Sequence, residues 1–164
     1  MKYPNLTQDR KKFIDGLTRS LFDDYGRGKD AKLEKLGEDR GITFLRDDRF
    51  VTPFTTYLGP LGLDTYVVCL PRSFEHPITT AHEIGHVILN HLTNEGESDV
   101  VEDEAWYFSQ RMTGKAVDLD FYSAYQDFLK TVNPTYVEME ELPLEELSEY
   151  RARIIMGYLL QDEK

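Results

Sequence analysis

The spacing of apolar residues predicts two helices in the first forty residues. Thr7 is a candidate N-cap. The apolar positions behind it recur at helical spacing, and the expected buried face consists of Phe13, Ile14, Leu17 and Leu21. Gly26 and Gly28 are expected to end this helix. A shorter helix is expected over residues 31–36, before a stop at Gly37 or Gly41.

Apolar runs without helical spacing predict three strands in the next thirty residues. The first is expected at residues 42–45, and a second is expected to begin at residues 50–52, before Pro53. Pro60 and Gly62 mark a loop, and the third strand is expected at residues 65–70. Its run from Tyr66 to Leu70 is continuously apolar, which indicates that this strand is buried.

Helical spacing returns after the third strand. A helix is expected over residues 81–92, starting at Ser73 or at His76–Pro77 and stopping near Asn94 and Gly96. The next helix is expected to run from a cap at Ser98 or Asp99 to Gly114. Its apolar stripe consists of Val101, Ala105, Phe108 and Met112.

Two further helices are expected near the C-terminus, at residues 119–130 and from Pro143 onward. The inward residues of the last helix are expected to be Leu144, Leu147, Ile154 and Tyr158, with Glu149 and Arg153 paired outside. The pattern therefore predicts the α+β class and a single domain over residues 1–164. The C-terminal helices are expected within about 119–162.

Composition restricts the partners and the cellular compartment that we expect for the protein. The formal net charge of -11 argues against direct binding of nucleic acid, whose phosphates attract basic proteins. The lone Cys69 cannot form an internal disulfide, and its apolar surroundings favour a buried hydrophobic role over a nucleophile. No apolar run is long enough to span a membrane, and residues 1–4 do not lead into a secretory segment. A cytoplasmic protein without a membrane partner is expected.

The candidate chemistry lies in the helix predicted at residues 81–92, which contains the pattern H-E-x-x-H at residues 82–86. Residues four apart share one helix face, so His82 and His86 can bind one metal ion. Glu83 projects beside that ion and can act as general base toward metal-bound water. The alternative is a chance match without a metal.

A catalytic zinc site usually has a third protein ligand. His91 would lie about 140° around a continued helix from His86, and leucines at positions 89 and 92 exclude the longer H-E-x-x-H-x-x-G-x-x-H pattern. Glu102 and Glu104 flank the apolar stripe of the next helix, and periodicity does not choose between them. The alternative role of Glu102 is a capping box with Asp99, and Glu104 could form an ion pair with Arg111 or simply face solvent.

Two segments, residues 80–91 and 102–108, resemble the ImmA/IrrE-type metallopeptidases. The second segment, Glu102-Asp103-Glu104-Ala105-Trp106-Tyr107-Phe108, is similar to the family's E-x-E-A-N-x-F-A. The resemblance implies a minimal gluzincin-like zincin domain, with its clearest core at about 30–115, in which Glu102 is the third metal ligand. It also implies that the strand before the metal helix lines a cleft and can pair with an extended substrate. Trp106 replaces the family's asparagine and Ser109 its alanine, and residues 110–114 differ as well.

The resulting hypothesis is a peptidase with Zn²⁺, or another divalent metal, held by His82, His86 and Glu102, with Glu104 as the alternative third ligand. Glu83 is the expected general base. Candidates for a second oxyanion donor are His76, His91, Tyr107 and several other tyrosines, which the sequence does not rank. The resemblance implies a protein substrate, a helix-turn-helix repressor of a mobile element or stress response. The alternative is a metal-stabilised regulatory module that binds a partner without cleaving it.

Overall fold

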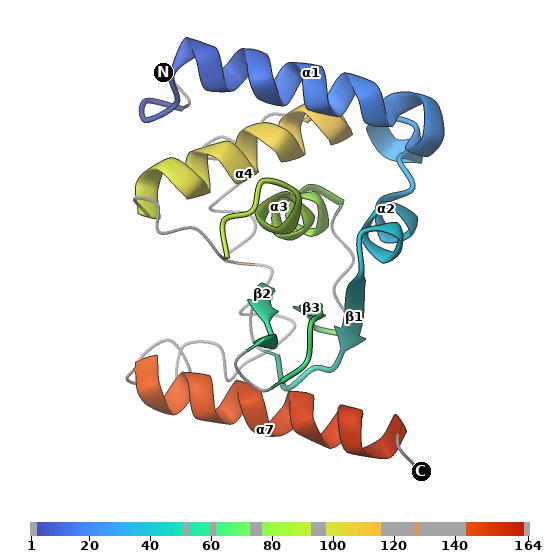
Figure 1. Cartoon of the computed structure of the whole chain (residues 1–164), viewed down its shortest axis with the longest axis vertical. Helices are drawn as coiled ribbons and strands as arrows, with labels where there is room; N and C mark the ends of the chain where they lie inside the picture. Colours follow the sequence, from blue (N-terminus) through green and yellow to red (C-terminus); the bar gives the residue numbers. More distant parts are fainter. Residues whose placement is uncertain are drawn as a thin grey trace.

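A computed structural model describes residues 3–50, 53–59, 62–72, 77–92, 98–115, 127 and 144–162. The predicted α+β class is confirmed, because helices surround a three-stranded mixed sheet (Figure 1). The elements are α1 (Gln8–Tyr25), a 3-10 turn (Gly28–Asp30), α2 (Leu33–Asp39), β1 (Ile42–Arg46), β2 (Phe54–Tyr57), β3 (Tyr66–Leu70), α3 (Pro77–Ile88), α4 (Ser98–Thr113) and α7 (Leu144–Asp162).

The sheet has the strand order β1-β3-β2, so β3 lies in the centre. Strand β1 runs parallel to β3, with Ile42 opposite Tyr66, and β2 runs antiparallel to β3, with Phe54 opposite Cys69. The central position explains the continuous apolar sequence of β3, because a strand covered on both faces has no solvent side. Because β3 is the central strand, it is not an edge of the sheet. The edge strand that contacts α3 is β2.

Side chains of β3 alternate between two apolar layers, as a strand requires. Val68 and Leu70 pack with the core between the sheet and helices α1 to α4. Val67 and Cys69 face the opposite side and pack with Ile154 of α7. Figure 1 shows this layering, with α1, α4 and α3 on one side of the sheet and α7 on the other. None of the helices in the described ranges is both long enough and apolar enough to cross a membrane.

Helix α1 begins as expected, since the Thr7 hydroxyl accepts a hydrogen bond from the Arg10 amide at 3.2 Å. It ends at Gly26, whose φ of 75° suits glycine. The expected burial of Phe13 is wrong, because its residue surface is 52 % exposed. Thr18 takes a buried place instead, since its hydroxyl donates to the carbonyl oxygen of Ile14 and so needs no water.

The second helix and the second strand both begin later than expected. Ala31 is extended after the 3-10 turn, so α2 starts at Leu33, and it continues through Gly37 to Asp39. A Cβ at Gly37 would collide with the ring of Phe44, which explains a glycine inside this helix. Phe50 closes a turn on Asp47 and is buried outside the strand, which begins after Pro53, a residue without an N–H for pairing. Residues 51–52 lie outside the described ranges.

Helix α7 follows the expected pattern where it is described. Ile154 is buried, and the Tyr158 hydroxyl donates to the Asp47 carboxylate at 2.7 Å, which anchors α7 beside β1. The expected pair of Glu149 and Arg153 is present, exposed and 4.0 Å long. The side chains of Leu144 and Leu147 and the helix expected at residues 119–130 lie outside the described part, apart from residue 127.

Candidate metal centre

Helix α3 places the two histidines of the H-E-x-x-H pattern side by side. It begins at Pro77, where a missing N–H is tolerated. His82 and His86 lie one turn apart, and both residues are buried, with exposed fractions of 4 % and 9 %. Their Nε2 atoms are 3.1 Å apart. Two imidazole nitrogens this close together can bind the same metal ion.

Helix α4 packs directly against α3 and brings a carboxylate to the histidines. Its predicted apolar stripe is confirmed, with Ala105, Phe108 and Met112 fully buried and Gly114 ending the helix at a φ of 73°. Ser98 and Asp99 already belong to α4, so their expected role as caps is wrong. A Cβ at Gly85 would lie 3.0 Å from Phe108 Cδ1, so the absence of a side chain there allows α4 to pack closely against α3. The Ser109 hydroxyl donates to the Ile78 carbonyl at 2.5 Å and binds α4 to α3.

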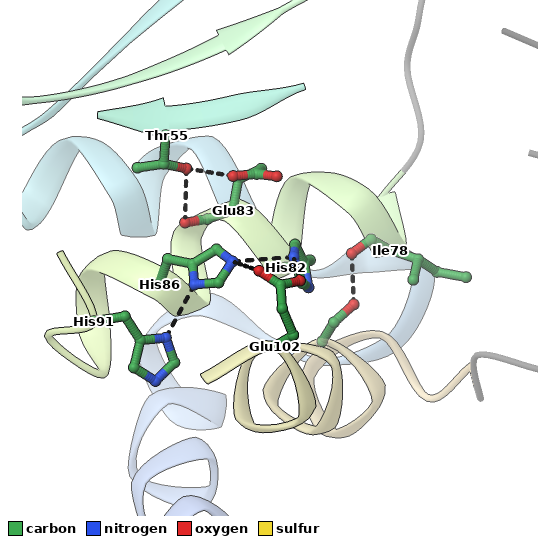
Figure 2. Close-up of polar contacts among 8 residues, drawn as sticks. Thr55, Ile78, His82, Glu83, His86, His91 and Glu102 are labelled. Carbon is green, nitrogen blue, oxygen red and sulfur yellow. Dashed lines mark hydrogen bonds and ion pairs between the residues drawn. The ribbon is translucent and has the colours of Figure 1, made fainter. Parts of the chain in front are cut away.

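Glu102 of α4 completes a group of three ligand atoms (Figure 2). Its Oε2 lies 3.1 Å from His82 Nε2, and its Oε1 lies 3.2 Å from His86 Nε2. Ligand atoms bound at about 2.0–2.1 Å in a tetrahedral zinc site lie roughly 3.3 Å apart. The three side chains therefore fit a metal ion of this size, and they could hold one. Glu102 uses its side chain here and not in a capping box with Asp99.

The charges in this group are mutually stabilised. Burial by itself would raise the pKa of Glu102, but hydrogen bonds from His82 and His86 outweigh burial and hold that pKa below its ordinary value. Burial likewise disfavours the charged form of His86, and the contact with Glu102 outweighs it, so the pKa of His86 is raised. An anionic carboxylate facing two imidazoles matches the ligand charges that a divalent cation prefers.

Glu83 lies next to this group and is held by the edge strand. The Thr55 hydroxyl of β2 lies 2.5 Å from Glu83 Oε2 and 3.2 Å from the Glu83 carbonyl oxygen, as Figure 2 shows. Glu83 is 7 % exposed and does not belong to the group of three ligand atoms. Sequence reasoning missed Thr55, because nothing local in a threonine-containing strand indicates contact with a helix 28 residues away.

Glu104, the alternative third ligand, points to a different partner. Its carboxylate accepts hydrogen bonds from Arg10 of α1, with Nε at 2.9 Å from Oε1. The expected pairing of Glu104 with Arg111 is wrong, since Arg111 lies 2.9 Å from Asp15. Helix α1 packs along α4, and this tertiary contact supplies a cation that spacing within α4 does not reveal.

The end of α3 corrects the expectation for His91. The helix stops at Ile88 because Asn90 adopts a φ of 60°, the left-handed conformation of a helix C-cap, before the expected stop at Asn94 and Gly96. The amides of Asn90 and His91 bond to the carbonyls of Val87 and His86 at 3.0 and 2.9 Å. This reversal places His91 Nδ1 3.0 Å from His86 Nδ1, instead of 140° around a helix. Burial, and after it the neighbouring His86, lower the pKa of His91 to about 4.

His82 is backed by an aromatic ring. The Trp106 indole lies with its centroid 3.8 Å from that of the His82 imidazole, at an interplanar angle of 32°. His82 Nδ1 is buried and has no hydrogen-bond partner among the described residues. The tryptophan thus orients the His82 ring by packing.

Other sequence candidates lie elsewhere. The Tyr107 hydroxyl donates to Asp15 of α1 at 2.7 Å, and burial, followed by this bond, raises the pKa of Tyr107 to about 12. Tyr107 therefore faces α1 instead of the ligand group. Cys69 is fully buried as expected, and burial raises the pKa of its thiol, which suits a structural role. His76 lies outside the described residues.

A pocket of about 430 Å³ opens over the ligand group. Pro53 and the first two residues of β2 line it on one side, and Val101 and Glu102 line it from α4. His91 and Leu92 also contribute. Its size falls in the range of small-ligand pockets. The structure thus brings the candidate metal ligands, Glu83 and an edge strand to one concave surface.

Comparison of the chain with protein-family models, with curated proteins and with solved structures finds no match.

Proposed function

We propose that this chain is a zinc-dependent peptidase with a minimal zincin-like domain. The observation that carries the proposal is the convergence of His82, His86 and Glu102, with ligand atoms 3.1–3.2 Å apart, beside the carboxylate of Glu83. Two imidazoles and one carboxylate are the ligands of known catalytic zinc sites in peptidases. The proposed substrate is a helix-turn-helix repressor of a mobile element or stress response in the cytoplasm, as the resemblance to ImmA/IrrE-type peptidases implies.

The chain's own residues account for the remaining chemistry. Zinc, when bound, supplies a Lewis acid that polarises the scissile carbonyl and acidifies water. Glu83 takes a proton from the attacking water, whose oxygen bonds to the carbonyl carbon. Glu83 then returns the proton to the amide nitrogen as the carbon–nitrogen bond breaks. The Thr55 hydroxyl donates a hydrogen bond to Glu83 Oε2 and so fixes the orientation of this carboxylate.

The test combines metal analysis with cleavage. Purified protein supplied with zinc should contain one zinc per chain, and it should cleave a helix-turn-helix repressor from the same genome at one site, read by mass spectrometry. Glu83→Gln should keep the metal and lose about 10²–10⁴-fold in cleavage rate. Glu149→Gln, at an exposed position of α7, is the matched control and should cleave normally.

Three results would contradict the proposal in different ways. Wild-type protein that takes up no zinc has no metal centre. Cleavage that continues at the wild-type rate in Glu83→Gln would show that Glu83 is not the general base. A zinc-loaded protein that binds the repressor without cutting it, and whose regulatory effect survives Glu83→Gln, is the non-cleaving interaction module.

A further inference from the structure

His86 has a second nitrogen that faces away from the ligand group. Its Nε2 lies 3.2 Å from Glu102, whereas its Nδ1 lies 3.0 Å from His91 Nδ1 (Figure 2). If Nε2 binds a metal, Nδ1 must carry the ring hydrogen and donate it. His91 Nδ1 is then the acceptor, which requires that the hydrogen of His91 be on its Nε2.

The other nitrogen of His91 faces a buried anion. His91 Nε2 lies 3.7 Å from Glu104 Oε2, a distance that allows electrostatic attraction but exceeds that of a hydrogen bond. His91 Nε2 is buried and has no hydrogen-bond partner among the described residues. The side chains of His91 and Glu104 are each 6 % exposed, so little water screens their attraction. The charge of Glu104 favours the hydrogen on the side of His91 that the contact with His86 requires.

Arg10 holds this anion from a distant part of the chain. Its guanidinium donates two hydrogen bonds to Glu104 Oε1, one of them from Nε at 2.9 Å. The pair joins α1 to α4 across 94 residues of sequence. The side chain of Arg10 is 41 % exposed, while that of Glu104 is not, so the buried carboxylate receives its charge partner from the surface.

We propose that His91, Glu104 and Arg10 form a positioning relay that fixes the ring orientation and tautomer of His86 for metal binding. The inference rests on the proposed metal centre but not on peptidase activity. The chain of contacts runs from His86 through His91 and Glu104 to Arg10, so α1 contributes to metal affinity without touching the metal. Partners of this kind typically change metal affinity by about 10–100-fold.

The first experiment is a matched pair at position 91. His91→Leu keeps much of the side-chain volume but removes the nitrogen that accepts from His86. His91→Asn places a carbonyl oxygen near the position of that nitrogen. We expect about 10–100-fold weaker zinc binding in His91→Leu, measured by competition with a chromophoric chelator, and recovery to within roughly threefold of wild type in His91→Asn. The visible spectrum of the Co²⁺-substituted protein should shift in His91→Leu and return in His91→Asn, because it reports ligand geometry.

The second experiment tests the far end of the relay. Arg10→Ala should weaken zinc binding by about three- to tenfold, since Glu104 loses its charge partner. Arg19→Ala removes the same charge from an exposed position of α1, about 13 Å along the helix, and should leave zinc binding unchanged. If His91→Leu fails to fold, the comparison of Arg10→Ala with Arg19→Ala tests the relay by itself.

The relay is overturned if His91→Leu binds zinc as tightly as wild type, or if His91→Leu and His91→Asn weaken zinc binding equally. It is also overturned if Arg10→Ala and Arg19→Ala have the same zinc affinity. In each of these cases wild-type protein still binds zinc, so the proposed function survives. Wild-type protein that binds neither zinc nor Co²⁺ overturns the relay and the metal centre together.

Discussion

The two histidines of the candidate centre are placed to bind the same metal ion, but their rings are supported in different ways. His86 contacts a buried histidine at 3.0 Å, and polar contacts continue from there to α1. His82 rests against the Trp106 ring at 3.8 Å, with its Nδ1 unbonded among the described residues. A polar contact selects both the tautomer and the orientation of a ring, whereas packing selects the orientation alone. The His86 side should therefore respond to changes in hydrogen bonding, and the His82 side to changes in volume.

The largest effect is expected from Glu102→Ala, which disrupts both sides at once because Glu102 faces both histidines. Zinc affinity should fall by more than the roughly 100-fold that marks the loss of an outer partner. Elemental analysis and a zinc titration would measure it. Glu104→Ala is the comparison, with a smaller loss through His91. If Glu104→Ala alone loses the metal, Glu104 is the third ligand and the assignment of Glu102 is wrong.

Removal of the ring behind His82 should have the next largest effect. Trp106→Ala should lower the free energy of unfolding by about 2–3 kcal/mol, less than for a fully buried tryptophan because Trp106 is half-buried. Zinc affinity should fall as well, and Trp106→Phe should restore most of both quantities by restoring a flat ring. Urea denaturation and a zinc titration test this pair. Equal affinities in all three proteins would show that packing does not orient His82.

Gly85→Ala should disturb both sides equally by widening the crossing of α3 and α4. Alanine favours a helix by about 1 kcal/mol, but its Cβ would meet the fully buried Phe108 at 3.0 Å, and such overpacking costs about 1–3 kcal/mol. We expect a net loss of about 1 kcal/mol in the free energy of unfolding. Gly16→Ala in α1 has open space around it and should stabilise by about 0.5–1 kcal/mol. Opposite signs in thermal unfolding would support the close crossing, whereas stabilisation by both would refute it.

The smallest effect is expected far from both histidines, at the anchor of α7. Hydrogen bonds from Arg49 hold the pKa of Asp47 well below its usual value, and Tyr158 lowers it further. A depressed pKa stabilises the fold above the unfolded pKa of about 4, and this contribution is lost as the pH falls below it. Tyr158→Phe should therefore cost about 1 kcal/mol at pH 7 and progressively less below about pH 4.

The control for the α7 variant is its zinc affinity, which should equal that of wild type. A pH-independent loss of unfolding free energy would contradict the role of the Asp47 charge. A weaker zinc affinity would show that the centre depends on the far side of the sheet as well.

Local rules predicted several elements correctly because neighbours in sequence decide them. Thr7 caps α1, Gly114 ends α4, and the continuous apolar run of β3 proved to be a strand buried on both faces. The errors concern the buried face of one helix and the start of one strand. Phe13 is exposed although its apolar character favours burial, and the second strand starts after Pro53 because Phe50 closes a turn on Asp47. A signal for the early end of α3 was present in Asn90, since asparagine tolerates a positive φ.

The sequence by itself determined that His82 and His86 share one face of a helix, because a spacing of four residues makes them neighbours in any α-helix. It also indicated a glutamate of the next helix as the candidate third ligand, without choosing between Glu102 and Glu104. Only the tertiary structure placed Glu102 at the histidines and Glu104 at Arg10, because the crossing of α3 and α4 and the packing of α1 decide where each carboxylate points. The contacts of Thr55 with Glu83 and of His91 with His86 are likewise tertiary, since a strand edge and a reversed helix end bring them together.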